Sequence, residues 1–273
     1  MASKPLRKRE ILDMNAFDKT SDAGPEDGLL ARRMRNVGAA SVLFYKRPIE
    51  MVRGRGCWLE AADGTRYLDF YNNVPSVGHC HPHVVAETTR QLAELNVNSR
   101  YLHRRTETYL ERLKATLPDT LSNVATTCSG SEANDLAMRV AMRASGGTGF
   151  VVTETAYHGN TSAVIEISPA SLKRGEPPAH VATVPAPSRE AYGDAIGEGF
   201  AEAVKRAIGA LRERGHEPAA LVADSIFSSD GVFPDPAGFL APAVAAMRKA
   251  GGVLIADEVQ PGFGRTGRMW GFE

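Results

Sequence analysis

Beyond Tyr71, segments with apolar residues at helical spacing alternate with short runs of consecutive apolar residues. Apolar residues three and four positions apart predict amphipathic helices. These helices are expected over 84–95, 102–117, about 199–214 and 240–249, and after the sequence SGSEAND. The short apolar runs predict strands buried on both faces. These strands are expected in NVATTC (123–128), GFVVTET (149–155), ALVADSIF (220–227) and GGVLIADEV (251–259). The alternation predicts an α/β fold with a mainly parallel sheet and helices on both faces.

The N-terminal part has a different pattern. The first forty residues are mostly polar, and Gly24, Pro25 and Gly28 lie close together, which predicts a mobile lead-in ending near Asn36. The following sequence CWLEAADGTRYLDF (57–70) has two short runs rich in aromatic and apolar residues around Asp63-Gly64. This pattern predicts a β-hairpin, and so a small β-containing segment before the main sheet.

The composition argues against nucleic-acid-binding, membrane-spanning, disulfide-rich and zinc-ribbon proteins. The 273 residues carry 32 basic and 32 acidic side chains, so no overall charge favours nucleic acid as a partner. No apolar run approaches the roughly 18 residues that a membrane-spanning helix needs, and we expect no membrane partner. The three cysteines form neither a disulfide framework nor a zinc ribbon. These features predict a cytoplasmic protein.

Three polar clusters follow predicted strands, at the edge of the sheet where α/β proteins bind ligands. In the first cluster, CSGSEAND (128–135), Gly130 and Ser131 begin a predicted helix. The free amides and the dipole of a helix start suit a phosphate group, and glycine allows close approach. The same residues also fit an ordinary helix cap, with Ser129 or Ser131 as the capping residue and Glu132 or Asp135 in the first turn.

The second cluster is Tyr157-His158-Gly159, directly after a predicted strand. The tyrosine ring could lie flat on a planar cofactor, and Gly159 would leave room for that cofactor. A surface loop with a half-buried tyrosine explains the same residues. The segment taken alone favours this second interpretation.

The third cluster is Asp257-Glu258-Val259-Gln260, at the end of the strand VLIA. An unpaired carboxylate near an apolar interior is costly, so Asp257 needs a cationic partner. A protonated pyridine nitrogen would serve, and the pairing would keep that ring an electron sink. A turn cap or a metal site shared with Glu258 are alternatives. Adjacent strand residues point to opposite faces, which argues against a shared metal ion.

A fourth stretch, GHCHPHV (78–84), contains His79, Cys80, His81 and His83. A metal site is possible in principle, but no second group of ligands at zinc spacing occurs elsewhere in the sequence. Pro82 fits the first turn of the following helix. We therefore expect a loop leading into a helix, and no metal site.

Taken together, DEVQPGFGRTG (257–267), CSGSEAND and AYHG (156–159) resemble the class III aminotransferases, which are pyridoxal-phosphate enzymes of the aspartate-aminotransferase fold. The stretches NNVPSVGHCHPHV, NSRYLH and AYHGNTSAVIEISP further resemble a subgroup. It contains alanine–glyoxylate-aminotransferase-2-like proteins and ethanolamine-phosphate phospho-lyases. The resemblance implies an N-terminal lead-in and small-domain segment over 1–70 and an incomplete large cofactor-binding domain over 71–273. It also implies that the family's C-terminal domain is absent.

The resemblance implies a role for each matching residue. Gly130 and Ser131 would hold the phosphate of pyridoxal 5'-phosphate. Tyr157 and Val259 would pack on the two faces of its ring. Asp257 would act in catalysis by pairing with the ring nitrogen, while His158 would be a neighbouring contact and Gln260 would lie near the ring hydroxyl. Members of the family work as homodimers on small-molecule amines and oxo acids.

The sequence also departs from the family's pattern. In the segment LVADSIFSSDGVFP (221–234), Asp224-Ser225 and Asp230-Gly231 replace a usual Glu-Pro and Gly-Gly pair. Ser229 stands where glutamate-using members often have a glutamate, which weakens a glutamate/2-oxoglutarate assignment. No lysine matches the family's Schiff-base position, which lies beyond GFGRTG. The sequence is therefore interpreted as a truncated enzyme.

The function expected from this resemblance is transfer of an amino group from an amine or amino acid to an oxo acid. An alternative with the same cofactor is elimination of phosphate from a phosphorylated amino alcohol. A third possibility is a non-catalytic short form that acts as a binding protein. The truncated chain by itself is expected to be inactive.

Overall fold

A computed structural model describes residues 16–18, 28–38, 43–72, 76–172 and 176–273. The chain divides into two compact units, Met1–Asn96 and Val97–Glu273. The predicted domain boundary at 70/71 falls inside the first unit. The assignment of 1–70 and 71–273 as separate domains stays a prediction.

The first unit contains two helices and a small antiparallel sheet. In chain order its elements are α2 (Leu29–Val37), β1 (Met51–Arg55), β2 (Trp58–Ala61), β3 (Arg66–Leu68) and α3 (Pro82–Glu94). The predicted hairpin is confirmed, because β2 pairs with β3 and the Thr65 amide bonds the Asp63 carboxylate in the turn. The sheet has a third strand, β1, which the pattern did not predict. Pro82 occupies the start of α3, as expected.

The prediction of a mobile lead-in ending near Asn36 is wrong for its last part. Residues 29–37 form α2, which starts after Gly28 and ends at Gly38, a glycine with a φ of 63°. The sequence LLARRMRNV is rich in leucine, alanine, arginine and methionine, which are strong helix formers. Residues 1–15 and 19–27 of the predicted lead-in lie outside the described residues.

The second unit is an α/β layer structure. Its helices are α4 (Arg104–Lys114), α5 (Gly130–Ser145), α6 (Arg189–Tyr192), α7 (Ile196–Glu213) and α8 (Ala241–Lys249), with a short 3-10 helix, η2 (Pro169–Ser171). Its strands are β4 (Gly149–Thr153), β5 (Val181–Val184), β6 (Pro218–Asp224) and β7 (Val253–Asp257). The strands form a parallel sheet in the order β5-β4-β6-β7. The expected α/β class and parallel sheet are confirmed.

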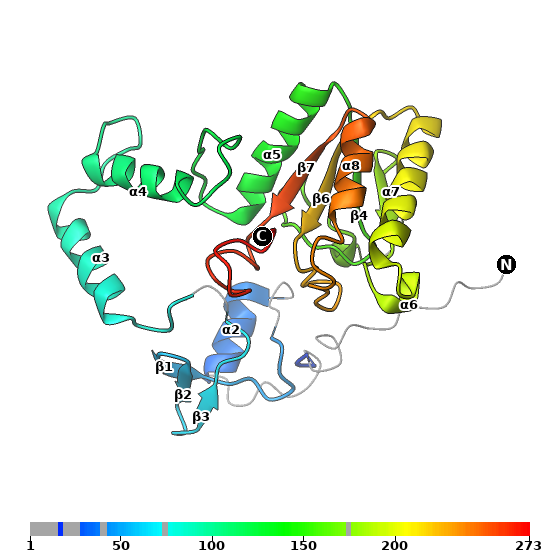
Figure 1. The fold of residues 1–273 in the computed structure, drawn as a ribbon. Helices are drawn as coiled ribbons and strands as arrows, with labels where there is room; N and C mark the ends of the chain where they lie inside the picture. The colour runs from blue at the N-terminus through cyan, green and yellow to red at the C-terminus, as the bar shows by residue number, and fades with distance from the viewer. Residues whose placement is uncertain (1–15, 19–27, 39–42, 73–75, 173–175) are drawn as a thin grey trace. The chain divides into compact units, whose positions relative to one another are not determined.

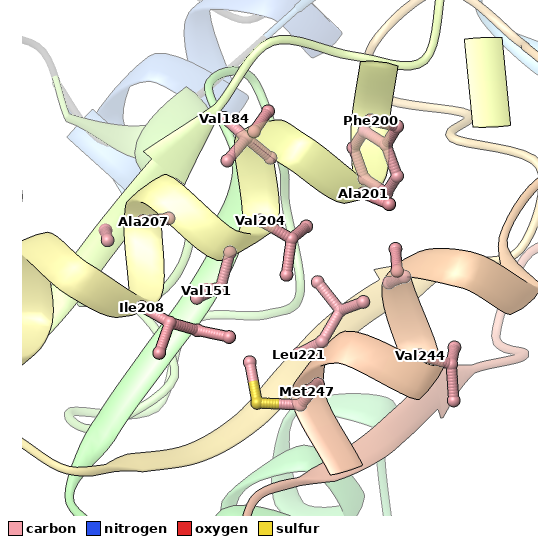
Figure 2. Packing of buried hydrophobic residues seen from close by; sticks show 14 of the residues in the cluster. Val151, Val184, Phe200, Ala201, Val204, Ala207, Ile208, Leu221, Val244 and Met247 are labelled. Atoms are coloured by element: carbon pink, nitrogen blue, oxygen red, sulfur yellow. The ribbon is translucent and has the colours of Figure 1, made fainter. Parts of the chain in front are cut away.

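Both faces of this sheet are covered, because alternate strand residues point to opposite sides. Val151 of β4 and Leu221 of β6 pack with α7 and α8, where Val204 and Met247 are buried (Figure 2). The neighbouring strand residues Phe150, Val152, Ala220 and Val222 pack on the other side with Met138 and Ala141 of α5. Figure 1 shows α5 on one side of the strands and α7 and α8 on the other.

Two local predictions about the region around α5 need correction. Residues 123–128 form no strand, because they lie mostly exposed and pair with no neighbouring strand of the described part of the chain. The apolar face predicted for the helix is shifted as well. Among its predicted members Ala133, Leu136, Ala137, Val140 and Ala141, only Ala141 is buried. Asn134 and Met138 are buried instead, and the polar Asn134 is there because it is hydrogen-bonded.

No helix in the described parts of the chain combines the length and the apolar character that crossing a membrane requires.

Candidate functional site

Asp257 ends β7 at the carboxyl edge of the sheet and is 7% exposed. Its Oδ2 accepts a hydrogen bond from Asn134 Nδ2 at 2.9 Å and lies 2.9 Å from His158 Nδ1. Its Oδ1 accepts from the Val259 amide at 3.1 Å. A carboxylate oxygen has two lone pairs. Oδ2 thus has two partners, and Oδ1 has capacity for a further donor.

The hydrogen bonds around Asp257 keep it ionised. Burial by itself would raise the pKa of this carboxyl group, but the hydrogen bond and charge of His158 outweigh it, with help from Val259 and Asn134. The net effect is a pKa below the usual value for aspartate. Asp257 is therefore a buried anion at neutral pH, the state that a cationic ring nitrogen would require.

His158 is fixed by the loop that follows β4. Its side chain is 2% exposed, and its backbone amide donates to Ser168 Oγ at 2.9 Å. Its carbonyl oxygen accepts a hydrogen bond from the same Asn134 amide group that bonds Asp257. Asn134 therefore joins α5, the loop after β4 and the end of β7.

The start of α5 is a capping box. Ser129 Oγ accepts from the Glu132 amide at 3.2 Å, and Glu132 Oε2 accepts from the Cys128 amide at 2.7 Å. Of the two possible caps, Ser129 takes this role. Ser131 does not cap the helix. Its hydroxyl bonds Asn160 in the loop after β4 instead. The cap and an anion site can coexist, because the first amides of a helix have no partner within the helix.

Two glycines allow these three segments to meet. A Cβ atom at Gly130 would lie 2.7 Å from Val259 Cγ2, and one at Gly159 would lie 2.4 Å from Ser131 Oγ. Gly159 also has a φ of 137°, which other residues rarely adopt. The residues predicted at three strand ends are thus in direct contact. Gly130 and Asp257 lie on the same side of the molecule.

Tyr157 and Val259 flank this cluster and expose apolar surface, at 50% and 66% of their area. Isolated exposed apolar residues are common, but these two belong to the same loops as His158 and Asp257. Gln260 is exposed as well. Two exposed apolar side chains beside a buried anion suit a planar ring with a cationic nitrogen. Their contacts with such a ring stay a prediction.

Asp257 and Glu258 diverge, as expected for adjacent strand residues. Glu258 accepts hydrogen bonds from Ser225 Oγ and from the amides of Gly271 and Phe272. Glu258 therefore holds the loop at 271–272 next to Ser225, and none of these hydrogen bonds involves Asp257. No group of three or more His, Cys, Asp or Glu residues that could hold a metal occurs in the described ranges.

Sequence reasoning missed Asn134 and Ser168, the two neutral residues that orient His158 and Asp257. The role of Asn134 was missed because this residue lies in a helix whose buried face was expected to be apolar. Its signal was the polar residue four positions after Gly130, on the same side of the helix. Ser168 gave no comparable signal, because its role depends on the path of the loop after β4.

The parallel sheet, the helix start beside Ser131 and the anion at the end of β7 fit pyridoxal phosphate. A phosphate suits the helix start, and the protonated ring nitrogen suits Asp257. The fold is that of the pyridoxal-phosphate-dependent transferases, as its solved neighbours show. A taurine:2-oxoglutarate aminotransferase from Bifidobacterium kashiwanohense shares it at a TM-score of 0.72 and 22% identity.

Residues 43–273 match the family described as aminotransferase class-III. An alanine–glyoxylate aminotransferase 2-like protein of Drosophila melanogaster is 39% identical over 254 residues, covering 88% of this chain and 51% of the relative. An ethanolamine-phosphate phospho-lyase homolog of Caenorhabditis elegans is 32% identical, with 92% and 57% covered. The solved structure of a phospholyase from Arthrobacter in complex with phosphoethanolamine superimposes with a TM-score of 0.84. It is 40% identical, with 90% of this chain and 59% of that chain covered.

The chain belongs to the class III aminotransferase family, whose cofactor is pyridoxal 5'-phosphate. It spans about half the length of the curated relatives it matches. The predicted subgroup is confirmed, since these relatives include both alanine–glyoxylate aminotransferase 2-like proteins and phospho-lyase homologs.

Proposed function

We propose that this chain supplies the cofactor-binding part of a pyridoxal-phosphate-dependent transaminase, which moves an amino group from an amine or amino acid to an oxo acid. The observation that carries the proposal is Asp257. It is a buried carboxylate with a lowered pKa and unused acceptor capacity on Oδ1, and the exposed side chains of Tyr157 and Val259 belong to the same loops as His158 and Asp257.

Pyridoxal phosphate, when bound, supplies a protonated pyridine ring that withdraws electrons from the substrate carbon. Asp257 would hold the proton on the ring nitrogen through its charge. Tyr157 and Val259 would hold the ring between them and exclude water from its faces. Gly130 and Ser131 would bind the phosphate through the helix start.

His158 and Asn134 have supporting roles in this proposal. Both hold Oδ2 of Asp257, so the carboxylate cannot rotate freely about its last bond. Gln260 would lie near the ring hydroxyl. The residue that moves the substrate proton in this family is a lysine, and no lysine of this sequence matches its position. We therefore propose that the 273-residue chain by itself has no turnover.

A phospho-lyase acting on a phosphorylated amino alcohol is a second candidate. The Arthrobacter phospholyase, with 40% identity and a TM-score of 0.84, favours it. Both reactions need the same ring and the same Asp257, so the two candidates differ in substrate. A chain extended to the length of the relatives would separate them. Phosphate release from phosphoethanolamine without an oxo acid supports the lyase, and keto-acid-dependent amine transfer supports the transaminase.

Assembly and location are also proposals. A homodimer is proposed from the family resemblance, and sedimentation of the extended chain would test it. A cytoplasmic location is proposed from composition, although the names of two relatives, from Arabidopsis thaliana and Homo sapiens, place them in mitochondria. If the sequence downstream of codon 273 encodes an in-frame lysine motif, the binding-only short form is excluded.

The substitution Asp257→Asn tests the proposed cofactor site. It keeps the shape of the side chain but removes its charge. A hydrogen bond to a charged group contributes about 1.5–3 kcal/mol, so we expect affinity for pyridoxal phosphate to fall by about tenfold to a hundredfold. A titration followed by cofactor absorbance measures it. Asp194→Asn, at a side chain 93% exposed, is the matched control. Equal affinity in the two variants would contradict the proposal.

A further inference from the structure

The loop after β4 carries Tyr157, and the backbone that follows this tyrosine is held by two serine hydroxyls. The His158 amide donates to Ser168 Oγ at 2.9 Å, and the Asn160 amide donates to Ser131 Oγ at 3.1 Å. These bonds attach the loop to the segment before η2 and to the first turn of α5. An oriented Tyr157 ring also requires that the backbone before it be held.

The backbone before Tyr157 is held by Asp230, from the loop that follows β6. The two carboxylate oxygens of Asp230 accept hydrogen bonds from the hydroxyls of Thr153, at 2.8 Å, and Thr155. Thr153 is the last residue of β4 and is 4% exposed. The Ala156 amide donates to the Thr153 carbonyl oxygen at 3.2 Å, which closes the turn. One carboxylate thus binds two residues of the turn by which the chain leaves β4 towards Tyr157.

The loop that carries Asp230 is itself anchored in the core. The Asp230 amide donates to the carbonyl oxygen of Phe227 at 3.0 Å, and Phe227 is buried against the rings of Phe200 and Phe239. Phe227 and Val232 have φ angles of 53° and 69°, which bulky and β-branched residues rarely adopt. Such conformations persist only where the surrounding structure fixes them. Asp230 is therefore a carboxylate in a fixed place.

The contact is particular to this sequence. Asp230-Gly231 stands where the resemblance leads us to expect the family's usual Gly-Gly pair. A glycine has no side-chain acceptor, so it could not bind the hydroxyls of Thr153 and Thr155. The two threonines have a partner here because the segment departs from the family's pattern.

We propose that Asp230 is a positioning residue that acts through Thr153 and Thr155 to set the path of the chain into Tyr157, and so the orientation of the tyrosine ring. The contact of that ring with the cofactor rests on the proposed function. The hold of Asp230 on the turn does not, and the two steps are tested separately.

Hydrogen exchange of the 273-residue chain without cofactor tests the first step. A hydrogen bond stabilises a local structure by an amount equivalent to about twofold to tenfold in its opening equilibrium. In Asp230→Ala, the amides of Ala156 and His158 should therefore exchange about twofold to tenfold faster, while the amides of β7 keep their rates. Asp194→Ala, at a side chain 93% exposed, is the matched control and should change neither amide.

Thr155→Val is the milder variant, because it removes one of the two donors while keeping the shape of the side chain. It should accelerate the same two amides by less than Asp230→Ala does, and it decides the question if Asp230→Ala does not fold. Unchanged exchange of Ala156 and His158 in a folded variant would overturn the inference, whatever the cofactor measurements show.

Affinity for pyridoxal phosphate, measured by absorbance titration, tests the second step. Loss of an aromatic contact weakens binding by about twofold to tenfold, so Asp230→Ala should lower the affinity by no more than this factor. In a Tyr157→Ala background the same substitution should have no effect, because no ring is left to orient. A purely structural Asp230 would lower the affinity by the same factor in both backgrounds, and this result would overturn the inference.

Failure of the proposed function gives a different result. Equal cofactor affinity in Asp257→Asn and its control would remove the proposed site. The exchange rates of Ala156 and His158 would still show whether Asp230 holds the turn before Tyr157.

Discussion

Among the described residues, two histidine–aspartate pairs lie in different settings, one in each unit. In the first unit, His79 Nε2 lies 2.6 Å from Asp69 Oδ2. In the second, His158 Nδ1 lies 2.9 Å from Asp257 Oδ2. The side chain of His79 is 20% exposed and that of His158 is 2% exposed. The same chemical pair is thus partly buried in one unit, with only the His79 ring reaching solvent, and fully buried in the other.

The partners of each aspartate show what each pair does. Asp69 accepts from the amides of Tyr71 and Asn72, so nearly all its donors come from the next few residues. His79 packs on Gly54, where an added Cβ would lie 2.9 Å from the His79 ring. The pair closes a local loop beside the hairpin. Nothing in its geometry requires a ligand.

Asp257 and His158 are instead 99 positions apart and join β7 to the loop after β4. Asp257 has acceptor capacity left on Oδ1, and His158 has a buried nitrogen without a hydrogen-bond partner in the described part of the chain. A buried polar group with unused capacity is unusual unless it has a function. The two pairs therefore differ in kind, because the Asp69 pair is satisfied by nearby residues, whereas the Asp257 pair joins distant segments and retains unused capacity on Oδ1.

His158→Ala should produce the largest effect on stability. Removing one member of a buried ion pair costs about 3–5 kcal/mol, because the other charge remains buried. We expect the low end, about 3 kcal/mol, because Asn134 and the Val259 amide still bond Asp257. Hydrogen exchange of the central sheet amides in β4 and β6 measures the loss. A change below about 1 kcal/mol would mean that this buried pair contributes no more than the partly exposed His79–Asp69 pair.

The sequence predicted three strands of the sheet, because β4, β6 and β7 are continuous apolar runs, but it missed β5 (Val181–Val184). Buried strands and the helices between them leave a strong periodic signal. The helix α2 and the strand β1 were missed. The polar, arginine-rich sequence of α2 resembles a lead-in, and β1 has exposed side chains with no alternation. The α2 segment nevertheless carries a helical signal, since Leu30, Met34 and Val37 are spaced four and three positions apart, whereas the local pattern of β1 is weak.

The candidate site was predicted in part. Asp257, His158, Gly130 and Ser131 were expected to converge because each follows a predicted strand, and the structure brings them together. Residues 123–128 form no strand before Gly130. The predicted approach of Gly130 to the end of β7 is nevertheless confirmed, because a Cβ atom at Gly130 would lie 2.7 Å from Val259 Cγ2. Asn134 and Ser168 were missed, because their roles depend on contacts over 10 to 123 positions, although the place of Asn134 on the helix gave a weak signal.

His79→Ala should have a smaller effect, which sharpens the contrast. Asp69 keeps its local amide donors and the His79 ring reaches solvent, so we expect the loss to be about 1 kcal/mol, near the upper end for pairs in contact with water. Amide exchange in the β2–β3 hairpin should therefore accelerate by no more than about fivefold. The backbone bridge between Gly56 and His79 does not depend on the ring and should persist. Complete loss of hairpin protection would show that this pair, too, is essential to its unit.

Acidification should have the smallest effect, and we expect this effect to be limited to Asp69 and the neighbouring amides of Tyr71 and Asn72. Burial raises the pKa of Asp69, but the amides of Asn72 and Tyr71 and the His79 hydrogen bond lower it by more. A carboxyl group with a lowered folded-state pKa contributes stability above its unfolded value of about 3.9, and this stability is lost as pH falls through the folded value. The Asp69 carboxyl carbon signal should therefore titrate well below pH 3.9, together with the loop amides of Tyr71 and Asn72. Because His79→Ala removes one of these contributions, it should move the Asp69 midpoint upward. An unchanged midpoint would mean that the amides alone hold the charge.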